Sequence, residues 1–225
     1  GSDPYIILND ADIPETVAAC TKGRLINGGQ SCIAAKRFLV EEGIYDDFKT
    51  ALVAEFKTYR YGDPTDTGTF VGPLAKSEFV KELEDICSRA EKAGDRKIYS
   101  SEAITSTDCY FAPVIYESYS AESPLMSEET FGPVAVLYKV KNIEEAIDIA
   151  NGTPFGLGGA IFSKNTTYAE EIAKERIEAG SVFVNDFVKS DPRLPFGGIN
   201  ESGYGRELSE FGLLEFTNIK TIYIK

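Results

Sequence analysis

The chain has 225 residues, of which 43% are hydrophobic and 26% are charged. Its 23 Lys and Arg against 36 Asp and Glu give a formal net charge of −13, which argues against nucleic acid and anionic membranes as partners. No apolar run approaches the ~18 residues of a membrane-spanning helix. The chain also has no histidine, which excludes histidine general bases and histidine metal ligands within it.

The first half of the chain predicts strands and helices in turn. Residues 5–8 form an apolar run typical of a buried strand, and Asp12 with Pro14 marks the start of a helix over residues 15–26. We then expect a strand at 38–40, an amphipathic helix at 44–59, a loop at 61–73, a helix at 80–94 and a strand at 97–100.

The second half alternates more plainly. It predicts strands at 134–140, 159–162 and 181–185, separated by helices at 143–150 and 168–177. Because short joints between strand and helix favour right-handed crossovers, we expect an α/β fold with a mainly parallel sheet in three layers, α/β/α. Residues 217–225 alternate in polarity and predict a terminal strand that pairs beyond its own domain. We therefore divide the chain into residues 1–201 and a C-terminal segment, residues 202–225.

The four cysteines have no Cys-x-x-Cys spacing, which argues against a zinc site and a dithiol redox pair. In a chain of this length, scattered cysteines favour reduced thiols and a cytoplasmic location. Cys32 ends the segment NGGQSC (residues 27–32), where backbone N–H groups can stabilise a thiolate without a histidine. It is therefore a candidate nucleophile. The alternative is a buried cysteine that acts as a small hydrophobe, which is our interpretation of Cys20, Cys87 and Cys109.

Two further segments carry candidate site residues. In EETFGP (residues 128–133), Glu129 could accept hydrogen bonds from sugar hydroxyls, although a solvated acidic turn is the alternative. The segment KSDPRLPFGG (residues 189–198) is rich in glycine and proline but matches neither a P-loop nor a dinucleotide fingerprint. On spacing alone it is a structural loop.

Together these segments resemble the aldehyde dehydrogenase family. The resemblance rests on NGGQSC with Lys36-Arg37, on ETFGP (residues 129–133), on NGTPFGL (residues 151–157) and on PFGG (residues 195–198). They occur in the family's order and approximate spacing over essentially the whole chain. The version SDPRLPF (residues 190–196) resembles the NAD(P)-dependent succinate-semialdehyde dehydrogenases in particular. The resemblance implies a catalytic domain over residues 1–201 and an oligomerisation strand at the end of residues 202–225.

The resemblance also implies the chemistry. Cys32 is the nucleophile that attacks an aldehyde to give a thiohemiacetal, which becomes a thioester and is hydrolysed to the carboxylic acid. Glu129 holds the nicotinamide ribose hydroxyls of NAD or NADP, and Phe131 lies beside that ribose. No metal is implied.

On the substrate side, the resemblance places residues 189–196 at the mouth of the aldehyde tunnel. We expect Ser190, Arg193 and Phe196 to bind the substrate there. Against a net charge of −13, Arg193 between two prolines is suited to hold a substrate carboxylate in a two-pronged hydrogen bond. Pairing of Arg193 with Asp191 is an equally open alternative.

The sequence departs from the family pattern at its start. Members carry a Glu-Leu-Gly-Gly segment whose Glu is the general base, and Gly1 matches the last Gly of that segment. The base, the N-terminal cofactor-binding domain and its oxyanion-hole Asn are absent from this chain. We therefore expect a fragment that is inactive by itself and that comes from a cytoplasmic homo-oligomer. Its expected partners are a small-molecule aldehyde and the missing cofactor domain, with no nucleic acid and no membrane.

Three other functions stay open on the sequence. The parent could oxidise another aliphatic aldehyde. The chain could be a thiol redox module in which Cys32 reacts with peroxide, although no cysteine follows Cys32 within fifty residues to resolve the product. It could also be an assembly module built on the terminal strand, which would leave Cys32 inert.

Overall fold

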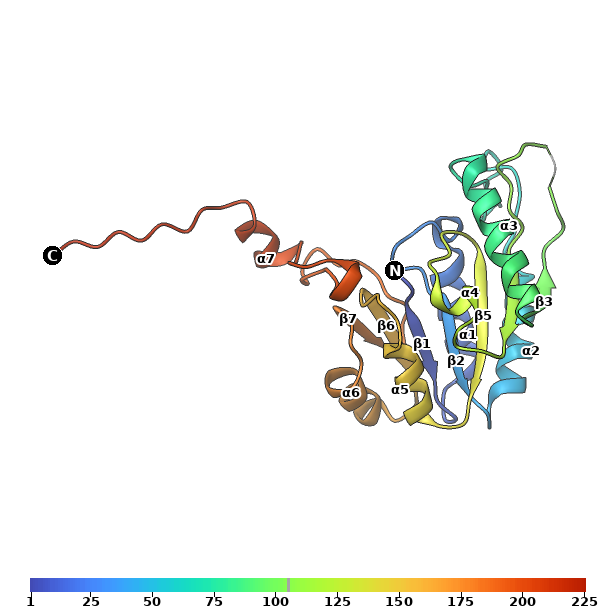
Figure 1. Ribbon diagram of the computed structural model, residues 1–225, viewed down its shortest axis with the longest axis horizontal. Helices are drawn as coiled ribbons and strands as arrows, with labels where there is room; N and C mark the ends of the chain where they lie inside the picture. The colour runs from blue at the N-terminus through green and yellow to red at the C-terminus, as the bar shows by residue number, and fades with distance from the viewer. Residues whose placement is uncertain (105) are drawn as a thin grey trace.

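The protein is described here by a computed structural model that covers residues 1–104 and 106–225. The centre of this described part is a seven-stranded sheet with the strand order β3-β4-β5-β2-β1-β6-β7 (Figure 1). Neighbouring strands are parallel except β3 and β4, which are antiparallel. The strands are β1 (Pro4–Ile7), β2 (Arg37–Glu41), β3 (Arg96–Ser100), β4 (Val114–Ser118), β5 (Val134–Val140), β6 (Gly158–Phe162) and β7 (Ser181–Val184). The expected mainly parallel sheet is thus confirmed.

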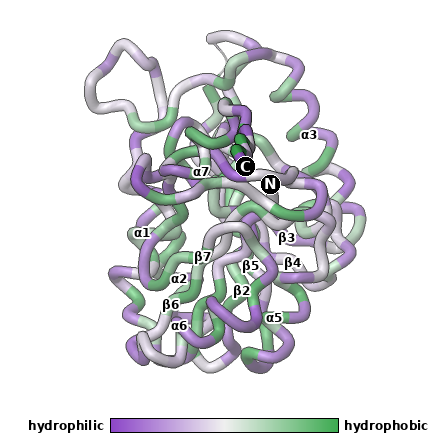
Figure 2. The backbone as a smooth tube through the Cα atoms, turned by 90° about the vertical axis from the view of Figure 1, so that its left-hand side faces the viewer, coloured by the Kyte–Doolittle hydropathy of each residue, from purple (hydrophilic) through white to green (hydrophobic). Residues whose placement is uncertain are grey.

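Helices cover both faces of the sheet, which confirms the three-layer α/β/α arrangement. Helices α1 and α2 pack on one face, and α3, α4, α5 and α6 pack on the other. Figure 2 shows α1 and α2 on one side of the strands and α3 and α5 on the opposite side. The helices are α1 (Ile13–Leu25), α2 (Tyr45–Phe56), α3 (Ser77–Lys92), α4 (Pro124–Ser127), α5 (Ile143–Asn151), α6 (Thr166–Glu175) and α7 (Ser209–Leu214), with 3-10 turns η1 (Ile26–Gly29) and η2 (Asn200–Ser202).

Each face of the sheet has its own apolar cluster because side chains alternate along a strand. In β1, Tyr5 and Ile7 pack toward α1 and α2, whereas Ile6 packs toward the helices of the other face. All three side chains are essentially inaccessible to solvent. A strand that is apolar at every position is therefore what a sheet buried on both faces requires.

The start of α1 follows the sequence rule for a capped helix. The Asp12 side chain accepts a hydrogen bond from the Glu15 N–H at 3.3 Å, and Pro14 lies in the first turn, where its missing N–H costs nothing. The other predicted strands and helices of the body are also present, within a few residues at their ends. The short elements β4, α4, α7, η1 and η2 were not predicted.

The strand expected over residues 217–225 is not formed. After α7 the chain leaves the body as an extended tail (Figure 1). The apolar side chains of this tail, Ile219, Ile222, Tyr223 and Ile224, are at least 74% exposed. A strand is defined by hydrogen bonds to a neighbouring strand, and within the described residues none lies beside this segment. The alternating pattern is therefore present without its partner.

No helix in the described ranges combines the length and apolar character needed to cross a membrane.

Candidate active site

Three segments that precede neighbouring strands meet at one end of the sheet. Strands β5, β2 and β1 are adjacent and parallel, so the residues before them lie along the same edge. Gly1 precedes β1, Cys32 precedes β2 and Glu129 precedes β5. The sheet topology thus brings together residues that are far apart in the sequence.

Cys32 lies at the tip of a tight turn. The Ala34 N–H donates to the Ser31 carbonyl at 3.1 Å, which closes the turn around Cys32, and the Ala35 N–H donates to Gly23 of α1 at 3.1 Å. Just before it, Asn27 has φ of 54° and Gly28 has φ of 64°, a left-handed conformation that reverses the chain. The turn therefore holds the Cys32 thiol outside the core.

The four thiols differ in accessibility. Cys32 is free and exposed, Cys109 is half-buried, and Cys20 and Cys87 are buried. Burial raises the pKa of the Cys20 thiol well above its usual value, and it raises the pKa of Cys87 to about 11. Because thiolate is the nucleophilic form, the last two are poor nucleophiles.

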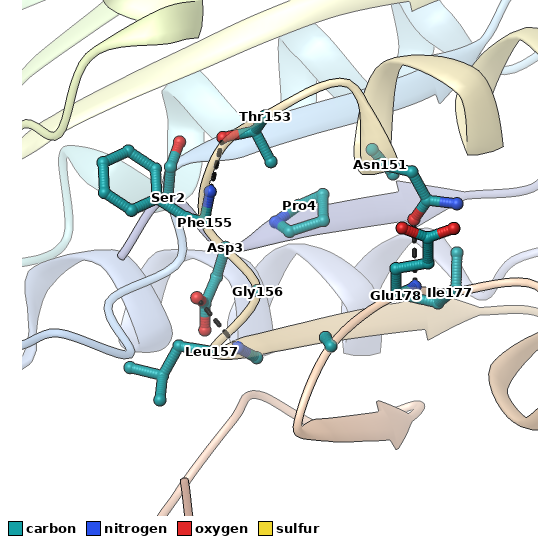
Figure 3. Close-up of a pocket in the computed structure, with 13 residues that line it drawn as sticks. Ser2, Asp3, Pro4, Asn151, Thr153, Phe155, Gly156, Leu157, Ile177 and Glu178 are labelled. Atoms are coloured by element: carbon teal, nitrogen blue, oxygen red, sulfur yellow. Dashed lines mark hydrogen bonds between the residues drawn. The ribbon is translucent and has the colours of Figure 1, made fainter. Parts of the chain in front are cut away.

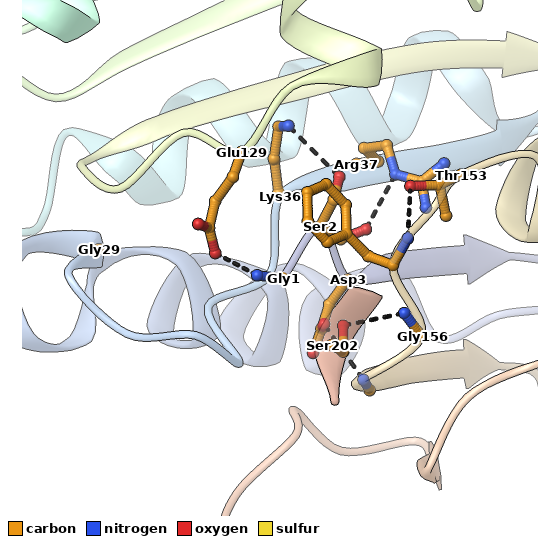
Figure 4. Close-up of polar contacts among 12 residues, drawn as sticks. Gly1, Ser2, Asp3, Gly29, Lys36, Arg37, Glu129, Thr153, Gly156 and Ser202 are labelled. Atoms are coloured by element: carbon orange, nitrogen blue, oxygen red, sulfur yellow. Dashed lines mark hydrogen bonds and ion pairs between the residues drawn. The ribbon is translucent and has the colours of Figure 1, made fainter. Parts of the chain in front are cut away.

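Gly1 connects the Cys32 turn to Glu129. Its amine donates to Oε1 of Glu129 (Figure 4), and a Cβ added to Gly1 would overlap the carbonyl oxygen of Cys32. The Glu129 side chain and the nearby Phe131 are each 38% exposed. The structure therefore brings Cys32, Glu129 and Phe131 to one edge, with an accessible carboxylate and an accessible ring.

A buried arginine that the sequence did not single out bonds both the segment before the Cys32 turn and the start of β5. Arg24 of α1 is 1% exposed, and it donates from Nη2 to the Gly29 carbonyl at 2.8 Å and from Nη1 to the Val134 carbonyl at 3.4 Å. Its burial lowers its pKa to about 10, still well above neutrality. A sequence signal existed, because Val17, Cys20 and Arg24 follow helical spacing on the buried face of α1.

Helix α3 holds the loop that carries Glu129 from the other side. Arg89 donates from Nη1 and Nη2 to the two carboxylate oxygens of Glu128 at 2.5 and 2.8 Å. Leu83 packs so closely on Gly132 that any side chain there would overlap it. This arrangement uses one of two adjacent acids as an anchor and leaves the other to face Gly1.

A buried polar layer surrounds the segment that leads into β1 (Figure 3). Asp3 is 1% exposed, its Oδ1 accepts from the Gly158 N–H at 3.2 Å, and its Oδ2 has no hydrogen-bond partner among the described residues. Burial raises the pKa of Asp3 to about 7, against the opposing effects of the Gly158 N–H and of nearby positive charges, including Arg37. A cavity of about 10 Å³ beside it is close to the size of one water molecule.

Ser2 accepts hydrogen bonds from two buried cationic side chains in the same layer. Lys36 donates from Nζ to Ser2 Oγ at 3.3 Å, and Arg37 donates from Nε to the Ser2 carbonyl at 3.0 Å (Figure 4). Burial lowers the pKa of Lys36 well below its usual range, with the nearby Arg37 and Arg24 acting in the same direction. These contacts fix the segment that leads from Gly1 into β1.

Two hollows flank the Cys32 turn. A groove of about 580 Å³ is lined by Cys32 itself, Leu157, Phe196 and residues of the C-terminal segment. A second hollow of about 270 Å³ is lined by the neighbours of Cys32, Ser31 and Ile33, together with η1 and the segment that ends at Ser190. Ser190 and Phe196 thus line different hollows near the turn.

Arg193 lines neither hollow. Its Nε and Nη2 donate to the two carboxylate oxygens of Asp191 at 3.0 and 2.6 Å, and its side chain is 86% exposed. These hydrogen bonds hold the pKa of Asp191 below its usual range. The structure therefore contains the Asp191 pairing that the sequence left open as the alternative to substrate binding.

Comparisons with known proteins match almost the whole chain. The model of the aldehyde dehydrogenase family matches residues 1–222. A succinate-semialdehyde dehydrogenase [NADP(+)] of Mycobacterium tuberculosis is 44% identical over 228 residues, which cover 100% of this chain and 49% of the relative. The succinate semialdehyde dehydrogenase [NAD(P)+] of Escherichia coli is 41% identical, over 99% of this chain and 48% of its own length.

Solved structures give the same picture. The succinic semialdehyde dehydrogenase of Streptococcus pyogenes, determined with NADP+ as the cofactor, superposes with a TM-score of 0.95 at 42% identity, over 100% of this chain and 49% of its own. The betaine aldehyde dehydrogenase of Staphylococcus aureus, in complex with NAD+, gives 0.90 at 32% identity, over 96% and 43%. The chain thus spans about half the length of the relatives it matches.

Proposed function

This chain belongs to the aldehyde dehydrogenase family, and from that premise we propose that it is the catalytic part of an NAD(P)-dependent succinate-semialdehyde dehydrogenase. The observation that supports this most directly is the exposed Cys32 thiol at the sheet edge where Glu129 and Phe131 also lie. The named activities of the mycobacterial and Escherichia coli relatives support the choice of substrate. The catalytic domain proposed is residues 1–201, with residues 202–225 serving assembly.

In the proposed reaction the Cys32 thiolate attacks the aldehyde carbon, and the new carbon–sulfur bond gives a thiohemiacetal. The backbone N–H of Cys32 supplies one half of an oxyanion hole for its oxygen. That carbon then loses a hydride and becomes a thioester carbon. Water attacks the thioester, the carbon–sulfur bond breaks, and the carboxylic acid leaves as the thiol is restored. NAD or NADP, when bound, supplies the acceptor for the hydride.

The residues at the edge of the sheet fit a nicotinamide nucleotide. An ionised carboxylate is an acceptor only, which suits the two hydroxyls of a ribose, and Glu129 presents its carboxylate partly to solvent. Phe131 offers an exposed ring next to it. Glu128, held by Arg89, is already satisfied and plays no part in binding.

On the substrate side we propose Ser190 and Phe196 as contacts, since each lines a hollow beside Cys32. For Arg193 the ion pair with Asp191 supports a structural role in its loop. The free Cys32 thiol must stay reduced to act, which supports a cytoplasmic location. We also propose a homo-oligomer, because the exposed apolar tail offers an unpaired strand.

The test is an activity assay on the full-length protein with succinate semialdehyde and either NADP or NAD. We expect reduction of the cofactor, and we expect Cys32→Ala to abolish it while the fold is retained. The present chain alone should give no turnover, because it spans only about half the length of the relatives it matches. Activity in the Cys32→Ala protein, or none in the unsubstituted full-length protein with any aldehyde of a panel, would contradict the proposal.

A further inference from the structure

The second hollow beside Cys32 has a largely apolar wall. Ile26, Ile33, Phe187 and Val188 are among its lining residues, and its volume is about 270 Å³. That is close to the lower end of small-molecule sites, which begin at roughly 300 Å³. Because Ser31 and Ile33 line it, the hollow lies against the residues on both sides of Cys32, which itself lines the neighbouring groove. It has room for a short aliphatic chain beside the Cys32 turn.

The charge of this wall is positive although the chain as a whole is strongly negative. Among the described residues that line the hollow, Lys189 carries the only charge, and no carboxylate lines it. Two ammonium groups stand over the ring of Phe187: Nζ of Lys22 lies 5.2 Å and Nζ of Lys189 lies 5.4 Å from its centroid. A ligand that enters this hollow with a negative end therefore meets the Lys189 ammonium group and no carboxylate among the described lining residues.

We propose that Lys189 is the residue that selects an aldehyde with a terminal carboxylate, by pairing its ammonium group with that carboxylate. This inference rests on the proposed function and names the group that makes it specific. Ser190, the next residue in the same wall, places a hydroxyl beside the site. Arg193, by contrast, is not among the residues that line the hollow.

Lys189 can exchange its present partner for a substrate. Its Nζ pairs with Asp186, three residues earlier, and the Lys189 side chain remains 51% exposed. Such exposed pairs contribute little to stability, so breaking one costs little. The long, flexible lysine stem lets the ammonium group swing from Asp186 to a carboxylate inside the hollow.

The test uses the reversible addition of aldehydes to Cys32 in the full-length protein without cofactor. Succinate semialdehyde and butanal have the same number of carbons, and only the former carries a carboxylate. Each should protect Cys32 from alkylation by iodoacetamide, measured as labelling of the Cys32 peptide by mass spectrometry. We expect Lys189→Gln to raise the protective concentration of succinate semialdehyde by up to about 5-fold, the upper end of the range for one partly exposed charge contact, and to leave butanal unchanged.

Matched variants separate charge from folding. Lys189→Arg should keep most of the protection, and Asp186→Asn, which frees the ammonium group, should lower the concentration needed. Arg193→Gln removes an equal charge nearby and should change neither aldehyde. Equal effects of Lys189→Gln on both aldehydes, no effect on either, or a selective effect of Arg193→Gln would overturn the assignment.

The outcome is independent of turnover. If the full-length protein oxidises succinate semialdehyde while Lys189→Gln leaves protection unchanged, the proposed function stands and the assignment of Lys189 fails. If Lys189→Gln weakens protection selectively but no aldehyde is oxidised, the anion site stands and the proposed function fails.

Discussion

Arg89 grips Glu128 with both terminal guanidinium nitrogens, while the adjacent Glu129 faces Gly1 and the Cys32 turn. Of these two neighbouring acids, one is held in an ion pair and the other contacts Gly1. The pairing reaches across 39 positions of sequence, from α3 to the segment before β5. It fixes the loop at Glu128 and leaves the carboxylate of Glu129 accessible to solvent.

Replacing Arg89 by Met should therefore impair cofactor binding more than stability. The pair is partly exposed, so we expect little change in the thermal midpoint. In the full-length protein we expect the KM for the nicotinamide cofactor to rise several-fold, with the KM for the aldehyde nearly unchanged. Arg60→Met, which breaks a surface pair with Asp66, is the control and should leave both constants alone. An equal rise in both KM values would mean that Arg89 does not act through this loop.

Thiol reactivity should follow accessibility. With iodoacetamide at neutral pH, Cys32 should label first and Cys109 second, while Cys20 and Cys87 should stay largely protected because they are buried. Mass spectrometry of the time course gives the order directly. Faster labelling of Cys20, Cys87 or Cys109 in the folded protein would remove the main support for Cys32 as the nucleophile.

Sequence patterns predicted the body of the fold well because local periodicity and burial agree there. The cap at Asp12, the apolar run of β1 and the strand β5 all carry their signal within a few residues. Strand β4 was missed because its five residues follow a long irregular stretch and Pro113. In the tail, residues 217–225, a strand was predicted but is not formed. Its alternation of polar and apolar residues is clear, but a strand also needs a hydrogen-bonding partner, which local sequence does not encode.

The candidate site was predictable only where single residues carry the chemistry. Cys32, Glu129 and Phe131 stand in recognisable segments, and the structure brings them to one edge. The contacts that position them join distant segments: Arg24 spans two loops, and Arg89 reaches Glu128 from another helix. Whether Arg193 would meet Asp191 or a ligand also depends on loop geometry, which composition does not specify.

Asp3 should make the chain less stable as the pH rises. Its pKa is raised from 3.8 to about 7 in the folded state, so folding is unpenalised below about pH 4 and loses stability as the pH rises through 7. The shift of about three units corresponds to a loss on the order of 4 kcal/mol. Asp3→Asn should flatten this part of the pH dependence of the unfolding free energy, measured by urea denaturation.

The control for Asp3 is Asp108→Asn, which removes the same charge from an exposed position. It should leave the slope between pH 4 and 7 as it is in the unsubstituted chain. An identical slope in the Asp3→Asn protein would show that Asp3 does not carry the effect.

Glu117 should act in the opposite sense, as an acid-sensitive anchor between α2 and the β3–β4 pair. Burial acts to raise its pKa, but hydrogen bonds from Tyr119, Tyr45, Lys49 and Arg96 outweigh it and lower the pKa to about 2. Its contribution is therefore present above about pH 4.5 and is lost as the pH falls toward 2. Glu117→Gln should cost about 1.5–3 kcal/mol at pH 7, the range for hydrogen bonds to a charged group.

Acid titration of the unfolding free energy provides the measurement for Glu117. The Glu117→Gln protein should lose less stability on acidification than the unsubstituted chain, whereas Glu122→Gln, at an exposed position, should behave like the latter. A Glu117→Gln protein that is as stable at pH 7 and as acid-sensitive as the original would refute this role.

The tail should control assembly. If residues 217–225 pair with a second copy of the chain, deleting the residues after Lys220 should shift the full-length protein toward monomer, because half of the strand is lost. Light scattering gives the mass. Replacing Ile219 by Ala, without deletion, should weaken assembly less. A mass unchanged by the deletion would mean that the tail is not the assembly element.

Because of the strand order, β1 cannot complete its pairing until late in synthesis. Strand β1 pairs with β2 on one side and with β6 on the other, and Asp3 finds its donor in Gly158. At the ribosome's pace of ~5–20 residues per second, the intervening ~150 residues take roughly 8–30 s to appear. During that interval the carboxylate of Asp3 and one edge of β1 have no native partner. The first strand of the sheet is therefore translated early, and its pairing is completed late.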